Sequence, residues 1–197
     1  MTDERTLSIY DRQSRDYAEM MDRDAERDPM IGRFIAMCPP GGRVLDLGCG
    51  AGHFAGRMAA AGLRVDALDA SAAMVDRTAR RPGVLARLGR FEDLDERSVY
   101  DGIWAYFSLL HARRRDLPDH LGRIAAALRP GGLVFLGMKR GSGSGRDRLG
   151  RYYEYYERED LETLLPRAGL QPGDCWFGTS TGMAGHPEGW IAIAARG

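Results

Sequence analysis

The stretch that decides the fold covers residues 44–52 and reads Val44-Leu45-Asp46-Leu47-Gly48-Cys49-Gly50-Ala51-Gly52. Its apolar first half predicts a buried strand, and its three alternating glycines predict a sharp turn that leads into a helix from about residue 53. A glycine inside a strand or helix costs roughly 0.5–1 kcal/mol relative to alanine. We therefore expect these glycines where the backbone turns sharply and lets a ligand come close.

An acidic residue, Asp46, stands two residues before the first glycine, near the end of the expected strand. A buried carboxylate is costly unless it meets a cation or hydrogen-bond donors. Together, the turn and the acid predict a nucleoside-type ligand that carries a positive charge and lies at the carboxyl end of this strand.

The chain has 197 residues, of which 44% are hydrophobic and 28% are charged, and its formal net charge is zero. This composition predicts one domain over residues 1–197, with a helical cap over 1–40 and the core over 41–197. The neutral balance creates no global basic field, so we do not expect a nucleic-acid partner. We expect a monomer or a homodimer.

Cysteine usage and hydropathy bear on the compartment. The cysteines, Cys38, Cys49 and Cys175, are odd in number and widely spaced, which argues against a disulfide framework and fits a reducing environment. The N-terminal segment is charged and lacks the apolar core of a signal peptide, and no apolar run of about 18 residues occurs. We expect a cytoplasmic protein without a membrane segment. The scattered histidines show no metal-ligand spacing, so we expect no bound metal.

Strand and helix patterns alternate along most of the chain. The expected strands cover 43–47, 64–68, 84–87, 100–106, 133–138, 170–177 and 190–195, and the expected helices cover 52–61, 72–80, 117–128 and 158–168. One or two short helices are expected in 3–28, another over 30–37, and a mobile Gly/Ser-rich loop over 140–151. Such βα repeats predict an α/β fold with a mainly parallel, doubly wound sheet, and the last two strands, which no helix separates, should pair antiparallel at one edge.

A second acid, Asp69, ends the second expected strand about 20 residues after Gly48, the position at which nucleotide-binding folds place the acid that takes the ribose hydroxyls. This spacing fits NAD as well as other nucleosides. A dinucleotide, however, brings its pyrophosphate to the start of the following helix. Because Asp46 lies close to that point, a ligand without phosphates is favoured.

Motifs along the chain resemble those of one family. They are VLDLGCGAG (44–52), VDALDAS (65–71), FEDL (91–94), YDGIWAYFSLLH (100–111), ALRPGGLVFLG (127–137) and EREDLETLLPRAGL (157–170). As a set they resemble the small, single-domain class I S-adenosylmethionine (SAM)-dependent methyltransferases of type 11/12/25, over roughly residues 8–195. The resemblance implies a Rossmann-like, seven-stranded sheet in the order 3-2-1-4-5-7-6 with strand 7 antiparallel. SAM, and its product S-adenosylhomocysteine, would bind across the carboxyl ends of strands 1, 2 and 4.

The resemblance also implies roles for single residues. Gly48 and Gly50 match the turn beneath the methionine part of SAM, Asp46 would lie near its α-amino group, and Asp69 would accept hydrogen bonds from both ribose hydroxyls. The remaining cofactor positions are Ala70, Ser71 and Met74 on the adenosine side, Phe91 and Glu92 beside the adenine, and Ala105 and Tyr106 at the methionine moiety.

Two cap tyrosines and one histidine are the acceptor-side candidates. Tyr10 and Tyr17, in YDRQSRDYAEM, resemble a pair that closes over SAM in related enzymes, although ordinary packing of the cap explains them as well. Tyr17 is also a candidate catalytic residue. His111 matches a histidine at the entrance to the acceptor site and could line that site or act as a general base.

Residues 151–157 hold four tyrosines, which could form a lid over the acceptor or simply pack, two inward and two toward solvent. The arginines of this region are either a solvated surface or a site that recognises an anionic acceptor; they are Arg113, Arg114, Arg115, Arg140, Arg146, Arg148 and Arg151.

These observations predict a methyltransferase that moves a methyl group from SAM to a nucleophilic atom of a small molecule by in-line displacement. The family motif for methylating exocyclic base nitrogens is absent, because Ala105-Tyr106-Phe107-Ser108 stands in its place. The methylated atom stays open among S, N, O and C. The alternatives are a protein or RNA acceptor, an NAD-dependent oxidoreductase, and a SAM-binding partner domain without activity.

Overall fold

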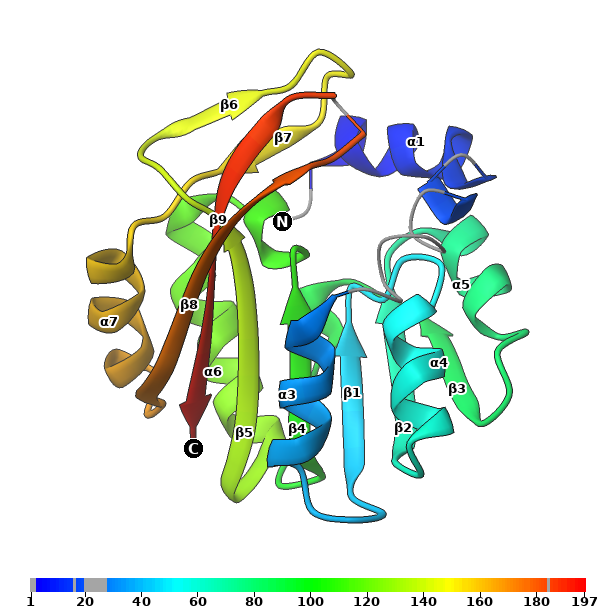
Figure 1. Ribbon diagram of the computed structural model, residues 1–197, viewed down its shortest axis with the longest axis vertical. Coiled ribbons are helices and arrows are strands. Elements are labelled where there is room, and N and C mark those ends of the chain that lie inside the picture. Colours follow the sequence, from blue (N-terminus) through cyan, green and yellow to red (C-terminus); the bar gives the residue numbers. More distant parts are fainter. Residues whose placement is uncertain (1–2, 16, 20–27, 184) are drawn as a thin grey trace.

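A computed structural model describes residues 3–15, 17–19, 28–183 and 185–197 (Figure 1). Its main sheet has seven strands in the order β3-β2-β1-β4-β5-β9-β8. Neighbours from β3 to β5 are parallel, whereas β9 is antiparallel to both β5 and β8. This confirms the expected sheet order and the antiparallel seventh strand. The strands are β1 (Arg43–Leu47), β2 (Arg64–Asp69), β3 (Val84–Leu88), β4 (Tyr100–Tyr106), β5 (Leu128–Lys139), β8 (Gln171–Thr181) and β9 (Pro187–Arg196).

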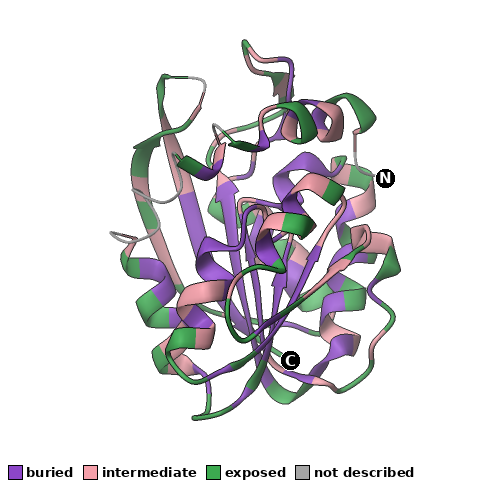
Figure 2. Cartoon of the chain, turned by 90° about the vertical axis from the view of Figure 1, so that its right-hand side faces the viewer, coloured by how far each residue is buried: buried purple, intermediate pink, exposed green. Residues whose placement is uncertain are grey.

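Helices cover both faces of the sheet, and the strands between them are buried (Figure 2). One face carries α3 (Pro29–Met37), α4 (His53–Ala60) and α5 (Ala72–Thr78), and the other carries α6 (Leu117–Ala127) and α7 (Arg158–Arg167). The short 3-10 helices are η1 (Phe91–Asp93), η2 (Leu109–His111) and η3 (Arg114–Asp116). No helix of the described residues is long and apolar enough to cross a membrane.

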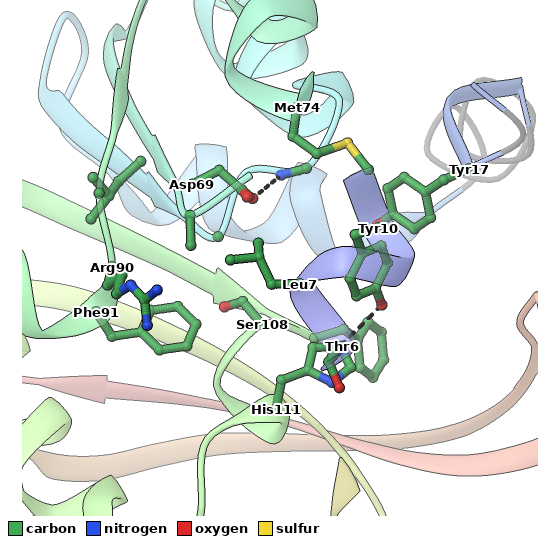
Figure 3. A pocket seen from close by; sticks show the side chains of 16 residues that line it. Thr6, Leu7, Tyr10, Tyr17, Asp69, Met74, Arg90, Phe91, Ser108 and His111 are labelled. Atoms are coloured by element: carbon green, nitrogen blue, oxygen red, sulfur yellow. Dashed lines mark hydrogen bonds between the residues drawn. The ribbon is translucent and has the colours of Figure 1, made fainter. Parts of the chain in front are cut away.

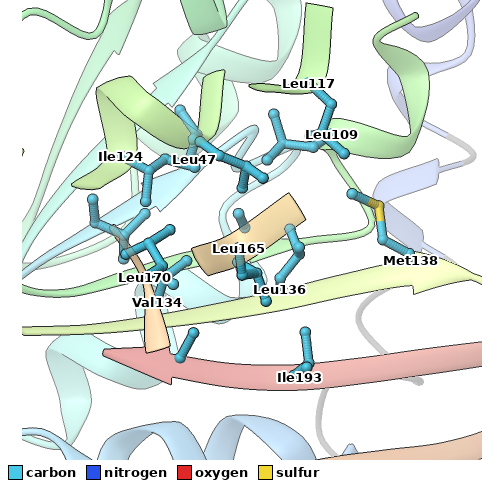
Figure 4. Close-up of a cluster of buried hydrophobic side chains, with 14 of the residues drawn as sticks. Leu47, Leu109, Leu117, Ile124, Val134, Leu136, Met138, Leu165, Leu170 and Ile193 are labelled. Atoms are coloured by element: carbon cyan, nitrogen blue, oxygen red, sulfur yellow. The ribbon is translucent and has the colours of Figure 1, made fainter. Parts of the chain in front are cut away.

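Alternation along the strands divides the core into two layers, because successive side chains of a strand point to opposite faces. On β4, Ile103 packs with the α6 and α7 side, while Trp104 packs with the α3 and α4 side. The first layer is mainly aliphatic, with Ile124 of α6 and Leu165 of α7 fully buried against the sheet (Figure 4). This two-sided burial holds the carboxyl ends of β1, β2 and β4 in a fixed arrangement.

Capping residues place the helices that surround those strand ends. The Asp28 side chain accepts from Met30 N at 2.7 Å, and Pro29 follows at the first position of α3. Ser71 accepts from Met74 N at 3.2 Å and so caps α5, as the sequence predicts. Gly62 follows α4 with φ +87°, a left-handed conformation that glycine adopts without strain.

The N-terminal cap is described in part. Helix α1 (Glu4–Arg12) begins at Asp3, whose side chain accepts from Thr6 N at 2.9 Å. The rest of the helical segment expected up to residue 28 lies partly outside the described residues. In Figure 1, α1 lies across the upper ends of the sheet strands, above the glycine turn.

Two hairpins differ from expectation. Residues 140–151, expected as a mobile loop, include β6 (Ser144–Arg146), which pairs antiparallel with β7 (Tyr152–Glu154). The sequence hides this because the hairpin is held by Asp147, whose carboxylate accepts from the backbone of Leu149 and Arg151 at 3.0 Å each. Composition alone does not report such a local network.

The last two strands are longer than expected. Instead of ending at 177 and beginning at 190, β8 runs to Thr181 and β9 begins at Pro187, so that Ser180 pairs with Glu188. The extra residues are rich in Gly, Ser and Thr, which are typical of loops. We call this extension, residues 178–183 and 185–189, the β8–β9 arm. It rises beside β6 and β7 toward α1 (Figure 1).

Candidate functional site

The glycine turn after β1 is built from left-handed backbone. Gly48, Gly50 and Gly52 have φ of +77°, +53° and +75°. Residues with a side chain rarely adopt these angles. The turn is joined to β2, because Gly48 N donates to Leu68 O at 2.7 Å.

The glycines also admit other parts of the chain. A Cβ on Gly48 would lie 2.3 Å from Cβ of Ser108, and a Cβ on Gly50 would lie 3.0 Å from the Tyr17 ring. Both distances are shorter than ordinary carbon–carbon contacts. In this structure the groups closest to the glycines belong to the protein itself. The segment after β4 packs against Gly48, and the N-terminal cap packs against Gly50.

Asp69 ends β2 and faces the turn. Its carboxylate accepts from Gly50 N and from Ser71 N at 2.8 Å each. Burial raises its pKa, while these backbone hydrogen bonds act in the opposite direction. One carboxylate thus fixes the glycine turn and the start of α5, and it also lines a cavity between α1 and the strand ends (Figure 3).

Asp46 is buried beneath the turn with 2% of its surface exposed. Burial, and secondly the charge of Asp69, raise its pKa to about 8. Its Oδ2 atom makes no hydrogen bond to the described residues. A buried carboxylate oxygen without a partner is costly, and a positively charged ligand group beside the turn would satisfy it. The site therefore fits a cationic cofactor.

The cavity between α1 and the strand ends, which we call the cofactor cavity, brings many of the predicted site residues together. Those that line it are Tyr10, Tyr17, Gly48, Gly50, Asp69, Ala70, Met74, Phe91 and His111. The cavity measures about 80 Å³, which is below the range of roughly 300–1,000 Å³ typical of small-molecule pockets. Leu7 of α1 extends into the space between Asp69 and Ser108 (Figure 3). A nucleoside therefore needs an outward movement of α1 to enter.

Five predicted cofactor positions do not line this cavity. Asp46 lies beneath it, and Ser71 donates its hydroxyl to Asp11 at 2.5 Å. Ala105 is fully buried in β4, and the Tyr106 side chain lines a different cavity. Oε2 of Glu92 is buried without a hydrogen-bond partner among the described residues. Their cofactor roles stay predictions.

Sequence reasoning missed two residues of the segment after β4. Ser108 is buried, lines the cavity, and its Oγ makes no hydrogen bond to the described residues (Figure 3). Phe107 has φ +57°, an uncommon conformation for a bulky residue that often marks functional sites. Their only sequence signal was the position directly after a strand of a βα unit.

His111 is held neutral by burial, and its hydrogen bonds fix which ring nitrogen carries the proton. Nδ1 lies 2.7 Å from the carbonyl oxygen of Tyr152, so it must carry the proton, which leaves Nε2 to accept from the Tyr10 hydroxyl at 3.0 Å. Burial lowers the pKa of His111 to about 4, and the charges of Arg151 and Lys139 act in the same direction. Both ring nitrogens are occupied, so this geometry supports a wall residue and gives no support to a general base.

A second cavity, of about 550 Å³, adjoins the first. Its walls come from α1, the start of α3 and α4, the segment 106–111, β5, the β6–β7 hairpin and the β8–β9 arm. Four side chains line both cavities: Tyr10, Tyr17, Phe107 and His111. We call the larger one the acceptor cavity.

The tyrosine-rich segment contributes one ring to the acceptor cavity. Tyr153 lines it, and Tyr156 is fully buried elsewhere, whereas Tyr152 and Tyr155 are half-buried. Burial raises the pKa of Tyr156, which is also packed under Arg114 at 4.4 Å from its ring centroid. This arrangement matches the packing interpretation, with two rings inward, more closely than a lid.

The doubly wound sheet with an antiparallel seventh strand, the glycine turn after β1 and the acid that ends β2 define the class I SAM-dependent methyltransferases. Residues 44–132 match the family model described as "Methyltransferase domain". The matched segment contains the glycine turn and Asp69, and methyltransferases of this kind use SAM as their cofactor. A search of curated protein sequences finds no match.

Solved structures of methyltransferases are similar in fold. A 1,6-didemethyltoxoflavin-N1-methyltransferase from Burkholderia thailandensis, solved with 1,6-didemethyltoxoflavin and S-adenosylhomocysteine, has a TM-score of 0.82 at 23% identity, over 98% of this chain and 87% of that chain. A SAM-dependent methyltransferase from Methanosarcina mazei has a TM-score of 0.74 at 16% identity, over 86% and 97%. A TehB-like methyltransferase from Corynebacterium glutamicum has a TM-score of 0.71 at 20% identity, over 93% and 97%.

Proposed function

We propose that this chain transfers a methyl group from SAM to a small molecule held in the acceptor cavity. The observation that carries the proposal is the shared wall between the two cavities, formed by Tyr10, Tyr17, Phe107 and His111. A methyl group has to pass from donor to acceptor in a straight line at close range, so the two binding sites must meet at one point. The shared wall is where they meet.

The residues of this chain bind the cofactor and the acceptor and orient them toward one another. In this proposal Asp46 pairs with the cationic group of the cofactor and Asp69 accepts from the ribose hydroxyls. The unpartnered Oδ2 of Asp46 and the place of Asp69 in the cavity wall support these roles. SAM, when bound, supplies a methyl group whose bond to sulfur breaks, with its electron pair going to sulfur, as the bond to the acceptor forms. Because the methyl carbon is already activated, alignment is the main requirement. This agrees with a site in which His111 is neutral and fully hydrogen-bonded.

The acceptor cavity supports a small acceptor rather than a macromolecule. Its volume of about 550 Å³ lies within the range of roughly 300–1,000 Å³ typical of small-molecule pockets. The net charge of zero offers no field for RNA. The Burkholderia thailandensis enzyme named above was solved with a small heterocycle in place. Nothing in the fold or the comparisons favours the NAD-dependent alternative.

Labelling tests the proposal. Purified protein is incubated with methyl-tritiated SAM and a cell extract, which is then separated into small-molecule, RNA and protein fractions. We expect the label in the small-molecule fraction, and label confined to protein or RNA would contradict the proposal.

A binding experiment tests the cofactor site separately. Titration calorimetry with S-adenosylhomocysteine should give binding that Asp69→Ala weakens by about tenfold or more, because the variant removes charged hydrogen bonds. Asp76→Ala, at an exposed position of α5, is the matched control and should bind like the wild type. Stabilisation by NADH and none by S-adenosylhomocysteine would overturn the cofactor assignment.

A further inference from the structure

Charge on the wall of the acceptor cavity is already neutralised by the protein. Two cations line it, Lys139 and Arg151. Lys139 forms an ion pair with Glu188 of the β8–β9 arm. Arg151 contacts Oδ2 of Asp147 through Nε at 2.9 Å and through Nη2 at 2.7 Å, in a pair whose side chains are only 5% and 6% exposed. An anionic ligand therefore meets no unpaired cation on this described wall.

The remaining contacts of the two cations are also internal. Nη1 of Arg151 donates to the Tyr10 hydroxyl at 3.1 Å, and its guanidinium lies 5.4 Å from the ring centroids of Tyr10 and Tyr153. Nζ of Lys139 lies 3.5 Å from the centroid of the Tyr153 ring. These aromatic faces already hold protein cations. A cationic ligand would compete with them and would also be repelled by their charge.

The arginines that the sequence suggested as an anion site are directed elsewhere. Arg114 pairs with Asp160 at 3.0 Å, Arg140 with Glu157 at 2.9 Å, and Arg146 with Asp3 at 2.7 Å. Arg113, Arg115 and Arg148 do not line the cavity either. The hypothesis that these arginines recognise an anionic acceptor is therefore not supported by their positions.

One further carboxylate lines the cavity, that of Asp28. It caps α3 by accepting from Met30 N at 2.7 Å, and the Tyr106 hydroxyl is also its hydrogen-bond partner. Burial raises its pKa. The capping role explains this acid without a ligand.

Flat aromatic rings form much of the remaining wall. The Tyr106 ring lies across Gly137 of β5, where a Cβ would be 2.3 Å from a ring carbon. The Trp190 ring lies across Gly178 of the arm in the same way, with a Cβ 2.3 Å from an indole carbon. Only glycine permits rings to lie flat on the neighbouring strand. The Tyr106 ring is also stacked on Trp104, with the ring centroids 4.5 Å apart, so the planar apolar face that remains for a ligand is that of Trp190. Such a face pairs well with other planar rings.

We propose that the acceptor is an uncharged, planar aromatic or heteroaromatic molecule that is methylated at a ring N–H or an O–H group. This rests on the proposed function. The acceptor's nitrogen or oxygen forms the bond to the methyl carbon as the carbon–sulfur bond breaks, and its proton leaves to water. A neutral ring can stack on Trp190, whereas an anion finds no free cation on the described wall and a cation meets Lys139, Arg151 and the sulfonium charge.

Four probes on one carbon frame test the proposal in the presence of S-adenosylhomocysteine. They are 2-naphthol (planar, neutral), 2-naphthoate (planar, anionic), 2-naphthylmethylammonium (planar, cationic) and decahydro-2-naphthol (non-planar, neutral). Titration calorimetry at pH 7 should give a Kd for 2-naphthol at least tenfold lower than for each of the others. Equal or tighter binding of the anion, the cation or the non-planar alcohol would overturn the proposal.

Three variants, one of them a control, test whether the cavity wall determines probe binding. Trp190→Leu should weaken 2-naphthol binding about tenfold and leave S-adenosylhomocysteine binding unchanged, whereas Phe177→Leu, at an exposed position of β8 outside the cavity, should change neither. Glu188→Gln leaves Lys139 without its partner, so 2-naphthoate should gain at least fivefold in affinity. An unchanged affinity for 2-naphthoate in Glu188→Gln would contradict the inference that Glu188 neutralises Lys139 on the cavity wall.

Titration with S-adenosylhomocysteine distinguishes failure of the proposed function from failure of the proposed acceptor class. Absence of S-adenosylhomocysteine binding would overturn the proposed function itself. Normal cofactor binding with probes that bind without regard to charge or planarity would overturn only the acceptor class.

Discussion

Asp46, the next-to-last residue of β1, and Asp69, the last residue of β2, lie on adjacent parallel strands, and the charge of Asp69 is, after burial, the second cause that raises the pKa of Asp46 to about 8. Asp46 is therefore mostly protonated at pH 7 in the free protein. A cationic group placed beside it favours the ionised carboxylate. If the cationic group of the cofactor binds beside Asp46, as we propose, cofactor binding and proton loss from Asp46 are coupled.

The first prediction concerns this coupling. Binding of SAM at pH 7 should release close to one proton, measured by calorimetry in phosphate and in Tris, whose ionisation enthalpies differ. The affinity for SAM should rise between pH 6 and pH 8. Asp46→Asn should abolish the proton release and weaken SAM binding by about tenfold, because it removes a charge-assisted contact. An unchanged buffer dependence in Asp46→Asn would exclude Asp46 as the source of the proton.

The second prediction is the stability of the free protein. The folded pKa of Asp46 lies above its ordinary value of 3.8, so between these pH values the folded chain holds a proton that the unfolded chain has released. The contribution of Asp46 to the free energy of unfolding is fully present below about pH 4 and is lost as the pH rises through 8. Urea unfolding should therefore show Asp46→Asn gaining stability over the wild type as pH rises from 5 to 8. Parallel pH curves for the two proteins would contradict the raised pKa.

The third prediction separates backbone strain from crowding at the turn. Gly48→Ala should lose more stability than Gly62→Ala, since both have a left-handed φ but only Gly48 faces a neighbour at 2.3 Å. The strain common to both is about 1–2 kcal/mol, and overpacking at Gly48 adds about 1–3 kcal/mol. Adding Ser108→Gly to Gly48→Ala should restore part of the loss in urea unfolding, and simple additivity of the two changes would contradict the contact.

The fourth prediction follows from the lowered pKa of His111. Its folded pKa of about 4 lies below its ordinary value of 6.5, so the unfolded chain binds a proton first as pH falls. The contribution of neutral His111 to the free energy of unfolding is fully present above about pH 6.5 and is lost as the pH falls toward 4. His111→Gln should reduce the slope of unfolding free energy between pH 6.5 and 4.5, while His186→Gln, at an exposed position, should keep it. A slope unchanged by His111→Gln would show that this residue is not buried neutral.

The fifth prediction compares two ion pairs of identical sequence spacing. Asp147–Arg151 is buried, and Arg158–Glu162 is exposed, and both are four residues apart. Asp147→Ala should destabilise the protein by about 3–5 kcal/mol, because it leaves a buried guanidinium without its partner. Glu162→Ala should have a far smaller effect in the same unfolding measurement. Similar losses of unfolding free energy in the two variants would mean that water solvates Arg151 when Asp147 is removed.

The cofactor half of the site could be predicted because its signals are local. The glycines after β1, the acid that ends β2 and the Ser71 cap are each specified by neighbours in the chain, and backbone geometry leaves few alternatives at left-handed positions. Asp46 could be singled out because buried carboxylates are costly.

The acceptor half could not be predicted, because its contacts join distant segments. The Trp190 ring depends on Gly178 across the β8–β9 arm, and Lys139 depends on Glu188. Neither pairing has a periodic sequence signal. Arg151 was misleading in the sequence: it stood in a basic, glycine-rich stretch, and only the fold shows that Asp147 neutralises it.

The β8–β9 arm has a consequence for how this protein can change. Its residues form the outer wall of the acceptor cavity but do not line the cofactor cavity, and the same holds for Tyr153 of the β6–β7 hairpin. Under the proposed function, substitutions in these two hairpins would alter which molecule is accepted without touching the glycine turn, Asp46 or Asp69. Descendants of such a chain can thus acquire new substrates by exchanging two short surface segments, while the methyl donor and the chemistry stay constant.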